Sequence, residues 1–134
     1  FCAQASEFDI LKQAAANDLR IARTLPITHL GRHALVVTMP DAAWSRRVVG
    51  IFANELVHLY AGRNIAVLVR NAAGYQVSLR APGEGPASMH LLAQRFATGN
   101  GRARAAGIQS LPESELPRLL EALEESPSPP KTAP

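Results

Sequence analysis

Apolar residues recur at helical spacing in the first part of the chain. Ser6 and Asp9 resemble a helix-capping pair, and the apolar positions that follow lie three or four residues apart. This pattern predicts an amphipathic helix over residues 7–24, which Pro26 ends. We therefore interpret residues 1–25 as a linker helix that precedes the domain itself.

Two β-hairpins are predicted in the middle of the chain. Dense β-branched and aliphatic residues at 34–39 favour a buried strand, which pairs with residues 27–30 in the first predicted hairpin. A continuous aliphatic run at residues 65–69 is followed by turn residues and by an alternating run at residues 75–80. These two runs predict the second hairpin.

Three further helices are predicted after the first hairpin. Asp41 is expected to cap a helix over residues 41–61, and residues 87–97 form a short helix. Residues 112–125 form an acidic last helix with one leucine face. The apolar stripe of the first of these helices is Trp44, Val48, Val49, Ile51, Phe52, Leu56 and Leu59, and the leucine face of the last is Leu116, Leu119, Leu120 and Leu123.

Strands separated by helices predict a mixed β-sheet flanked by helices, and therefore an α/β or α+β fold. The 134 residues are enough for one compact domain with a core, but few for two. We predict a single domain over residues 26–125. The Ser/Pro-rich residues 126–134 are predicted to be a disordered tail.

Basic side chains predominate in the body of the chain and acidic ones near its end. Residues 1–110 carry 12 Lys and Arg against 6 Asp and Glu, whereas residues 111–134 carry 2 against 5. Most of the basic residues are arginine, whose planar fork suits bidentate contacts to phosphate. A GC-rich genome would also enrich arginine without a functional reason, so the charge supports an anionic partner without identifying it.

Several features predict a soluble domain in the cytoplasm. No apolar stretch approaches the roughly 20 residues of a membrane-spanning helix. Cys2 is the single cysteine, so no internal disulfide forms, which suits a reducing compartment. The chain begins with Phe1 and shows no secretory signal, and we expect it to be a piece of a longer protein.

Glycine and arginine gather in residues 99–107, where backbone N–H groups can converge on an anion while guanidinium groups close over it. Arg80 ends a predicted strand, which would hold its guanidinium at the edge of the sheet. Phosphate is the expected ligand. Two alternatives stay open: a flexible loop with solvated arginines, and an ion pair between Arg80 and a carboxylate such as Glu84. The candidate binding residues are Arg80, Gly99, Asn100, Gly101, Arg102 and Arg104.

No metal site or catalytic residue is predicted in this chain. Glu55 and His58 lie one helical turn apart, but no second pair has ligand spacing. The serines have no nucleophile elbow, and the single cysteine has no evident base.

The order of three segments resembles the C-terminal DHH-associated domain of DHH-family phosphoesterases: Ser78-Leu79-Arg80, then a helix, then residues 99–107. That domain typically shows a Ser-Leu-Arg strand, a helix, and a glycine run leading through His and commonly Pro into Ala-Ala-Gly. The resemblance covers roughly residues 30–110. Arg102 stands in the place of the usual His and Ala103 in the place of the Pro, and the glycine run is shortened.

The resemblance implies the substrate-binding domain of a manganese-dependent phosphoesterase. In such enzymes an N-terminal domain with an Asp-His-His motif binds manganese, and the C-terminal domain holds the substrate. It implies that Arg80 and residues 99–104 contact phosphate, with no cofactor in this chain. The implied partners are the missing catalytic domain and a phosphorylated small molecule, nucleotide or short single-stranded oligonucleotide.

Two alternative functions remain at this point. One is a structural or homodimerisation module that uses the helix over residues 41–61 or the leucine face of the last helix. The other is a single-strand nucleic-acid binder without catalysis, although few aromatic residues are available for base stacking.

Overall fold

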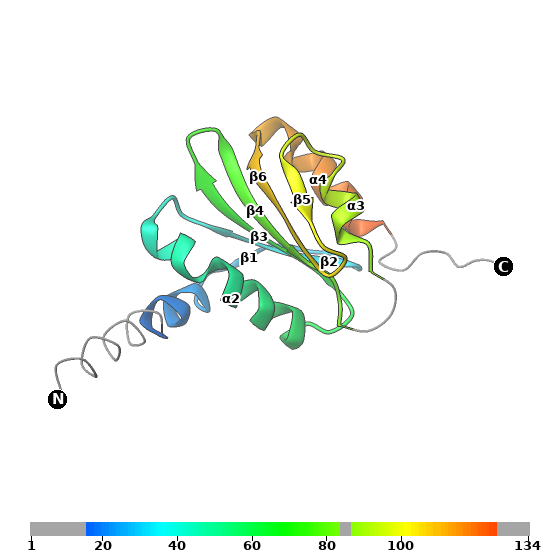
Figure 1. The fold of residues 1–134 in the computed structure, drawn as a ribbon. Helices are drawn as coiled ribbons and strands as arrows, with labels where there is room; N and C mark the ends of the chain where they lie inside the picture. Colours follow the sequence, from blue (N-terminus) through cyan, green and yellow to red (C-terminus); the bar gives the residue numbers. More distant parts are fainter. Residues whose placement is uncertain (1–15, 84–86, 126–134) are drawn as a thin grey trace, which may run out of the picture.

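The computed structural model describes residues 16–83 and 87–125, which form one β-sheet with helices on both faces (Figure 1). The six strands lie in the order β1-β2-β3-β4-β6-β5. β2 and β3 are parallel and the other neighbours are antiparallel, so the predicted α+β fold with a mixed sheet is confirmed. The elements are β1 (Ile27–Leu30), β2 (Ala34–Met39), α2 (Ala43–Leu59), β3 (Asn64–Asn71), β4 (Gly74–Arg80), α3 (Met89–Ala93), β5 (Gly99–Gly101), β6 (Ala105–Leu111), the 3-10 turn η1 (Glu113–Glu115) and α4 (Leu116–Glu124).

Both predicted hairpins are present. β1 pairs with β2, and β3 pairs with β4 through the turn at residues 72–73. α2 crosses from the end of β2 to the start of β3, as a parallel pair of strands requires. Of the predicted first helix, residues 16–22 are helical, while residues 7–15 lie outside the described residues, as does the predicted tail at 126–134.

Three local predictions are wrong. Ala42, not Asp41, is the N-cap of α2, and Asp41 instead forms an ion pair with Arg46. Ile51 and Leu59 of the predicted apolar stripe are exposed, because the sheet contacts only the opposite side of α2. Residues 99–101 and 105–111, for which the sequence predicts no strand, form β5 and β6.

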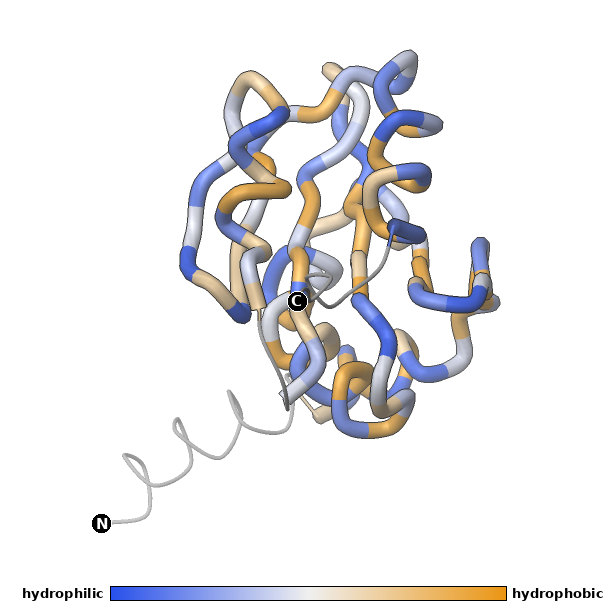
Figure 2. Tube along the Cα trace, turned by 90° about the vertical axis from the view of Figure 1, so that its right-hand side faces the viewer, coloured by the Kyte–Doolittle hydropathy of each residue, from blue (hydrophilic) through white to orange (hydrophobic). Residues whose placement is uncertain are grey.

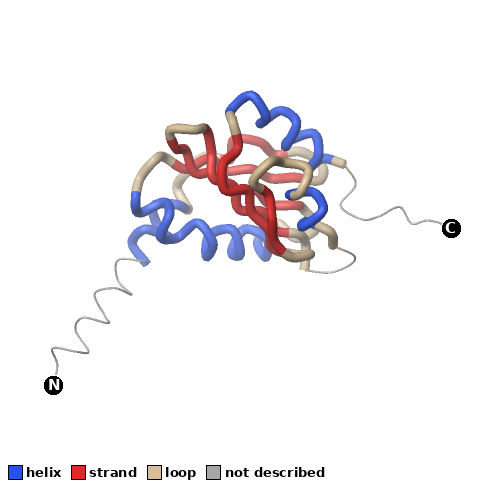
Figure 3. The backbone as a smooth tube through the Cα atoms, turned by 45° about the horizontal axis from the view of Figure 1, so that its top comes forward, coloured by secondary structure: helices blue, strands red, loops and turns tan. Residues whose placement is uncertain are grey.

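The two faces of the sheet bury separate apolar clusters. α2 packs on alternate residues of β2 and β3, among them Val37 and Val67. α3 and α4 pack on the other face, against residues such as Leu68 and Leu79. Figure 3 shows the helices on either side of the strands, and Figure 2 shows apolar stretches along the strands with hydrophilic turns around them. Successive side chains of each strand point to opposite faces of the sheet, so the same strands supply apolar residues to both clusters.

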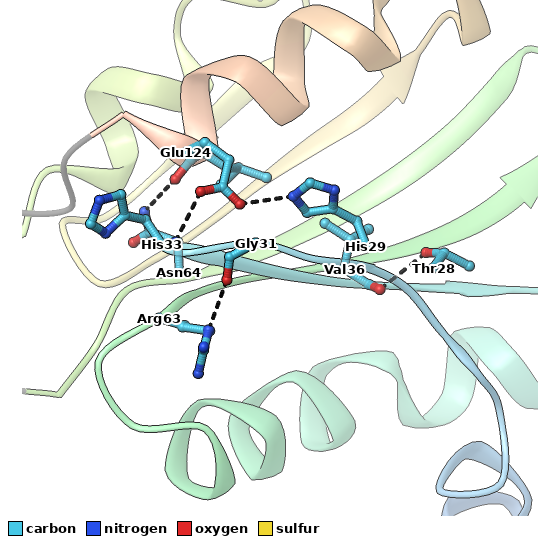
Figure 4. Close-up of polar contacts among 9 residues, drawn as sticks. Thr28, His29, Gly31, His33, Val36, Arg63, Asn64 and Glu124 are labelled. Atoms are coloured by element: carbon cyan, nitrogen blue, oxygen red, sulfur yellow. Dashed lines mark hydrogen bonds and ion pairs between the residues drawn. The ribbon is translucent and has the colours of Figure 1, made fainter.

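The end of α4 is fastened to the turn between β1 and β2 through Glu124 (Figure 4). Its Oε2 lies 2.8 Å from Nε2 of His29, and its Oε1 accepts the backbone N–H of His33 at 2.9 Å. Asn64 of β3 donates to the backbone oxygen of Leu123 at 3.0 Å. Burial raises the pKa of Glu124, but the hydrogen bonds from His29 and His33 outweigh it, so the pKa of Glu124 is lowered.

Within the described residues, no helix is both long enough and apolar enough to cross a lipid bilayer.

Candidate anion-binding site

One half of the sheet presents a polar surface on the α2 side. The apolar cluster beneath α2 takes its strand residues from β2 and β3. On β4, Gln76, Ser78 and Arg80 point to this same side, because they alternate with buried residues that face α3 and α4. The face formed by β4, β6 and β5 is therefore polar next to α2.

A shallow hollow of about 410 Å³ lies on this polar face. Its polar side chains are neutral amides and hydroxyls on or next to β4, β5 and β6, and Gly107 of β6 lies in its floor between Ser78 of β4 and Asn100 of β5. Glycine at this position leaves the hollow open, since any side chain there would project into it. The polar side chains that line it are Gln76, Ser78, Thr98, Asn100 and Gln109.

Arg80 lies at the end of β4, beside this hollow and next to α2. Its Nε donates to Oδ1 of Asn54 at 2.7 Å, and its Nη1 donates to the backbone oxygen of Leu79 at 2.9 Å. In the sheet it pairs with Ala105, the first residue of β6. Arg80 is the last residue of its strand, as predicted, although β4 lies inside the sheet and not at its edge, and its role in binding stays a prediction.

The turn between β5 and β6 brings Arg102 close to Arg80. The backbone N–H of Arg102 donates to the carbonyl of Ala105 at 2.8 Å, which closes the turn beside the end of β4. Burial, and after it the positive charge of Arg102, lowers the pKa of Arg80. Among the described residues no carboxylate pairs with either guanidinium. Two neighbouring positive charges therefore share this end of the sheet without a described counter-charge.

The glycine segment is built differently from the expectation. The backbone N–H of Gly99 donates to Phe96 O at 3.0 Å, and that of Gly101 donates to Oδ1 of Asn100 at 2.8 Å. Together with the closed turn at Arg102, these bonds use amides that were expected to converge on an anion. That expectation is wrong for these three amides, because the segment is a hairpin and its N–H groups bind within the protein.

The remaining candidates and alternatives are placed as follows. The Arg104 guanidinium donates to the backbone oxygen of Pro82, so its part in anion binding stays a prediction. Glu84, the alternative partner of Arg80, lies outside the described residues. Glu55 is bound by Arg23 at 2.6 and 2.9 Å, and His58 Nδ1 lies 2.7 Å from its own helix carbonyl at residue 54. The described residues contain no group of three His, Cys, Asp or Glu arranged to hold a metal.

Sequence reasoning missed Asn54, Gln76 and Gln109 as residues of this surface. The signal for Gln76 was present, since it lies in the alternating run at residues 75–80 between the apolar Tyr75 and Val77. Asn54 gave no signal, because it is an ordinary exposed position on an amphipathic helix until the fold places Arg80 against it.

Comparison with known proteins agrees with this fold. The family model described as the DHHA1 domain matches residues 31–126. An exopolyphosphatase-related protein from Bacteroides fragilis superposes with a TM-score of 0.59 at 16% identity, over 84% of this chain and 34% of that one. RecJ from Thermus thermophilus, in complex with Mn²⁺, gives 0.59 at 19% identity, over 84% of this chain and 16% of that one.

The chain thus spans about a third or less of these two structures, and likeness at such identity concerns the fold alone. No curated protein sequence matched. The family match covers most of the chain and includes the strand and hairpin motifs that suggested the resemblance. The chain therefore belongs to the DHHA1 domain family of DHH-family phosphoesterases.

Proposed function

We propose that this domain binds the substrate of a DHH-family phosphoesterase and holds a phosphate group of that substrate between Arg80 and Arg102. The observation that carries the proposal is that strand register places the turn bearing Arg102 beside Arg80 at the end of β4, next to a polar hollow and without a described carboxylate paired to either guanidinium. Neighbouring like charges destabilise each other. A phosphate between them would replace that repulsion with charge-assisted hydrogen bonds to both planar forks.

The chemistry of the hollow favours a nucleotide or a short single-stranded oligonucleotide as the substrate. Its polar lining side chains are neutral donors and acceptors, among them Gln76, Asn100 and Gln109. Such groups fit the edge of a base or the hydroxyls of a sugar. A bare chain of phosphates would instead need further cations along the surface, and the residues that line the hollow include none.

The parent enzyme on this proposal is a hydrolase whose catalytic domain holds manganese. The structure of RecJ from Thermus thermophilus is a complex with Mn²⁺, which supports that expectation for a relative of the same fold. The present domain would supply the positioning of the phosphoester and not the metal centre. Its partners are the catalytic domain and the nucleotide, and the cytoplasm remains the predicted compartment.

Replacing either arginine by alanine tests the proposal in the intact protein. Arg80→Ala and Arg102→Ala should each raise KM or lower turnover of a phosphodiester substrate by about tenfold, since each removes a charged hydrogen-bond donor. Arg95→Ala is the matched control, because Arg95 follows α3 on the other side of the sheet and its side chain forms an exposed ion pair with Glu125. Unchanged kinetics for both site variants would remove the assignment.

The leucine face of the last helix does not support the alternative of a self-association module. Leu119 and Leu123 are fully buried, and Leu116 and Leu120 pack against the same cluster on the domain's own sheet. These side chains are therefore not free to form a subunit contact.

A further inference from the structure

We infer that Asn54 is the positioning residue of the anion site: it orients the Arg80 guanidinium without neutralising it. This inference rests on the proposed function, because it explains how the arginine keeps its charge available for a phosphate. Asn54 lies on α2, an element that contributes no residue to the motifs by which the domain resembles its family.

Two hydrogen bonds fix the plane of the guanidinium. Asn54 Oδ1 accepts from Nε at 2.7 Å, and the carbonyl of Leu79 accepts from Nη1 at 2.9 Å. Because these acceptors come from α2 and from β4, the group cannot rotate without losing one of them. Preorganisation of this kind reduces the entropy that a ligand must offset on binding.

The third nitrogen of the group, Nη2, lies beside α2 at Gly50. Gly50 lies one turn before Asn54 on α2, and a Cβ added at Gly50 would come within 3.6 Å of Arg80 Nη2. That distance is an ordinary van der Waals contact, so Nη2 lies close to the helix backbone at this position. No described residue accepts a hydrogen bond from Nη2, so this nitrogen remains for a ligand.

The other arginines near α2 differ from Arg80 in their acceptors. Arg46 and Arg47 pair with carboxylates, Asp41 and Asp18. The Nε of Arg80 instead donates to the neutral side-chain amide of Asn54. A neutral acceptor satisfies the Nε donor while leaving the positive charge of the guanidinium uncompensated.

Glu55, which follows Asn54 in the sequence, does not supply the missing negative charge. Its carboxylate accepts two hydrogen bonds from Arg23, and the hydrogen bond from Arg23 lowers the pKa of Glu55. The one acidic residue beside Asn54 on α2 is thus already paired with a different arginine, and Arg80 keeps its charge.

Substituting aspartate for Asn54 separates this role from a structural one. Aspartate has nearly the same shape, so Asn54→Asp retains the acceptor and adds a charge that pairs with Arg80. A merely structural contact would be kept or strengthened. A site that needs an unneutralised guanidinium would lose its phosphate, since the new carboxylate both competes with it and repels it.

The test measures binding of a short fluorescein-labelled oligothymidylate to the intact protein by fluorescence anisotropy, with thermal unfolding recorded for every variant. Asn54→Asp should raise Kd at least tenfold, to about the level of Arg80→Ala, without lowering Tm. Asn54→Ala, which loses only the orientation, should raise Kd about fivefold. Asn54→Gln keeps a neutral amide acceptor and should bind within about twofold of the wild type.

The inference and the proposed function fail in different ways. If Arg80→Ala binds like the wild type, or if the wild type shows no saturable binding, the proposed function falls and the inference with it. If Arg80→Ala weakens binding but Asn54→Asp and Asn54→Ala do not, the inference alone is overturned. In the Arg80→Ala background, Asn54→Ala should have no further effect, and an undiminished effect there would also overturn the inference.

Discussion

Gly101 allows the hairpin that carries Arg102, and replacing it should destabilise the domain by more than backbone conformation alone explains. Its φ of +146° is a conformation that side chains disfavour. A Cβ at this position would lie 2.3 Å from the Cα and 2.5 Å from the Cβ of Ala106 on the paired strand. Neither atom belongs to a flexible side chain, so the two strands must separate locally.

The expected loss of stability in Gly101→Ala combines the backbone strain with the close contact to Ala106, and two other glycines serve as controls. Backbone strain and forced repacking together should cost Gly101→Ala about 2–5 kcal/mol of unfolding free energy. Gly62 has φ +86° but nothing within 4 Å of an added Cβ, so Gly62→Ala should cost about 1–2 kcal/mol from conformation alone. Gly83 has open space and no positive φ, and Gly83→Ala should stay within about 0.5 kcal/mol.

Urea denaturation monitored by the fluorescence of Trp44, the single tryptophan, measures all three variants. The predicted order of destabilisation is Gly101→Ala, then Gly62→Ala, then Gly83→Ala. If Gly101→Ala costs no more than Gly62→Ala, then β5 does not lie against β6 as described, and the placement of Arg102 is wrong.

Two further predictions concern the packing that supports the site. Glu124→Gln should lower stability by about 1 kcal/mol at neutral pH, because it removes a charged acceptor from His29 and His33. Folding lowers the pKa of Glu124, so its contribution to the free energy of unfolding is full above the ordinary pKa of 4.5. That contribution is lost as the pH falls through the lower pKa of the folded state. The denaturation curves of variant and wild type should therefore converge in acid. A constant difference down to strongly acidic pH would contradict this. Leu79→Ala should cost about 2–5 kcal/mol of unfolding free energy in the same urea assay, because Leu79 is fully buried. Leu91 is 56% exposed, so Leu91→Ala should change the unfolding free energy little. Equal effects would show that the cluster under α3 and α4 is misplaced.

Local patterns predicted most of the fold. α2 and the two hairpins combine clear periodicity with turn residues, so short stretches of sequence contain the information that defines them. β5 and β6 are different, because Gly99, Gly101 and the run of small residues from Ala105 to Gly107 have low strand propensity. β6 depends on pairing with β4, and β5 depends on pairing with β6, and local patterns do not reveal these tertiary partners.

The candidate site was predictable only in part for the same reason. Arg80 and the glycine segment were suggested by residue type and by the family resemblance, and the register between β4 and β6 brings them together. Asn54 could not be found this way, because its significance depends on how α2 crosses the sheet. The expectation of a backbone amide nest was wrong because glycine and arginine content alone does not distinguish a free loop from a closed hairpin.

A structure of the intact protein with a non-hydrolysable phosphorothioate dinucleotide bound would test the central claim most directly. We predict that an oxygen of the phosphorothioate contacts both Nη2 of Arg80 and the guanidinium of Arg102, with one nucleoside over the hollow beside Gln76. A ligand bound elsewhere on the domain, or a protein carboxylate bridging the two arginines, would contradict the account.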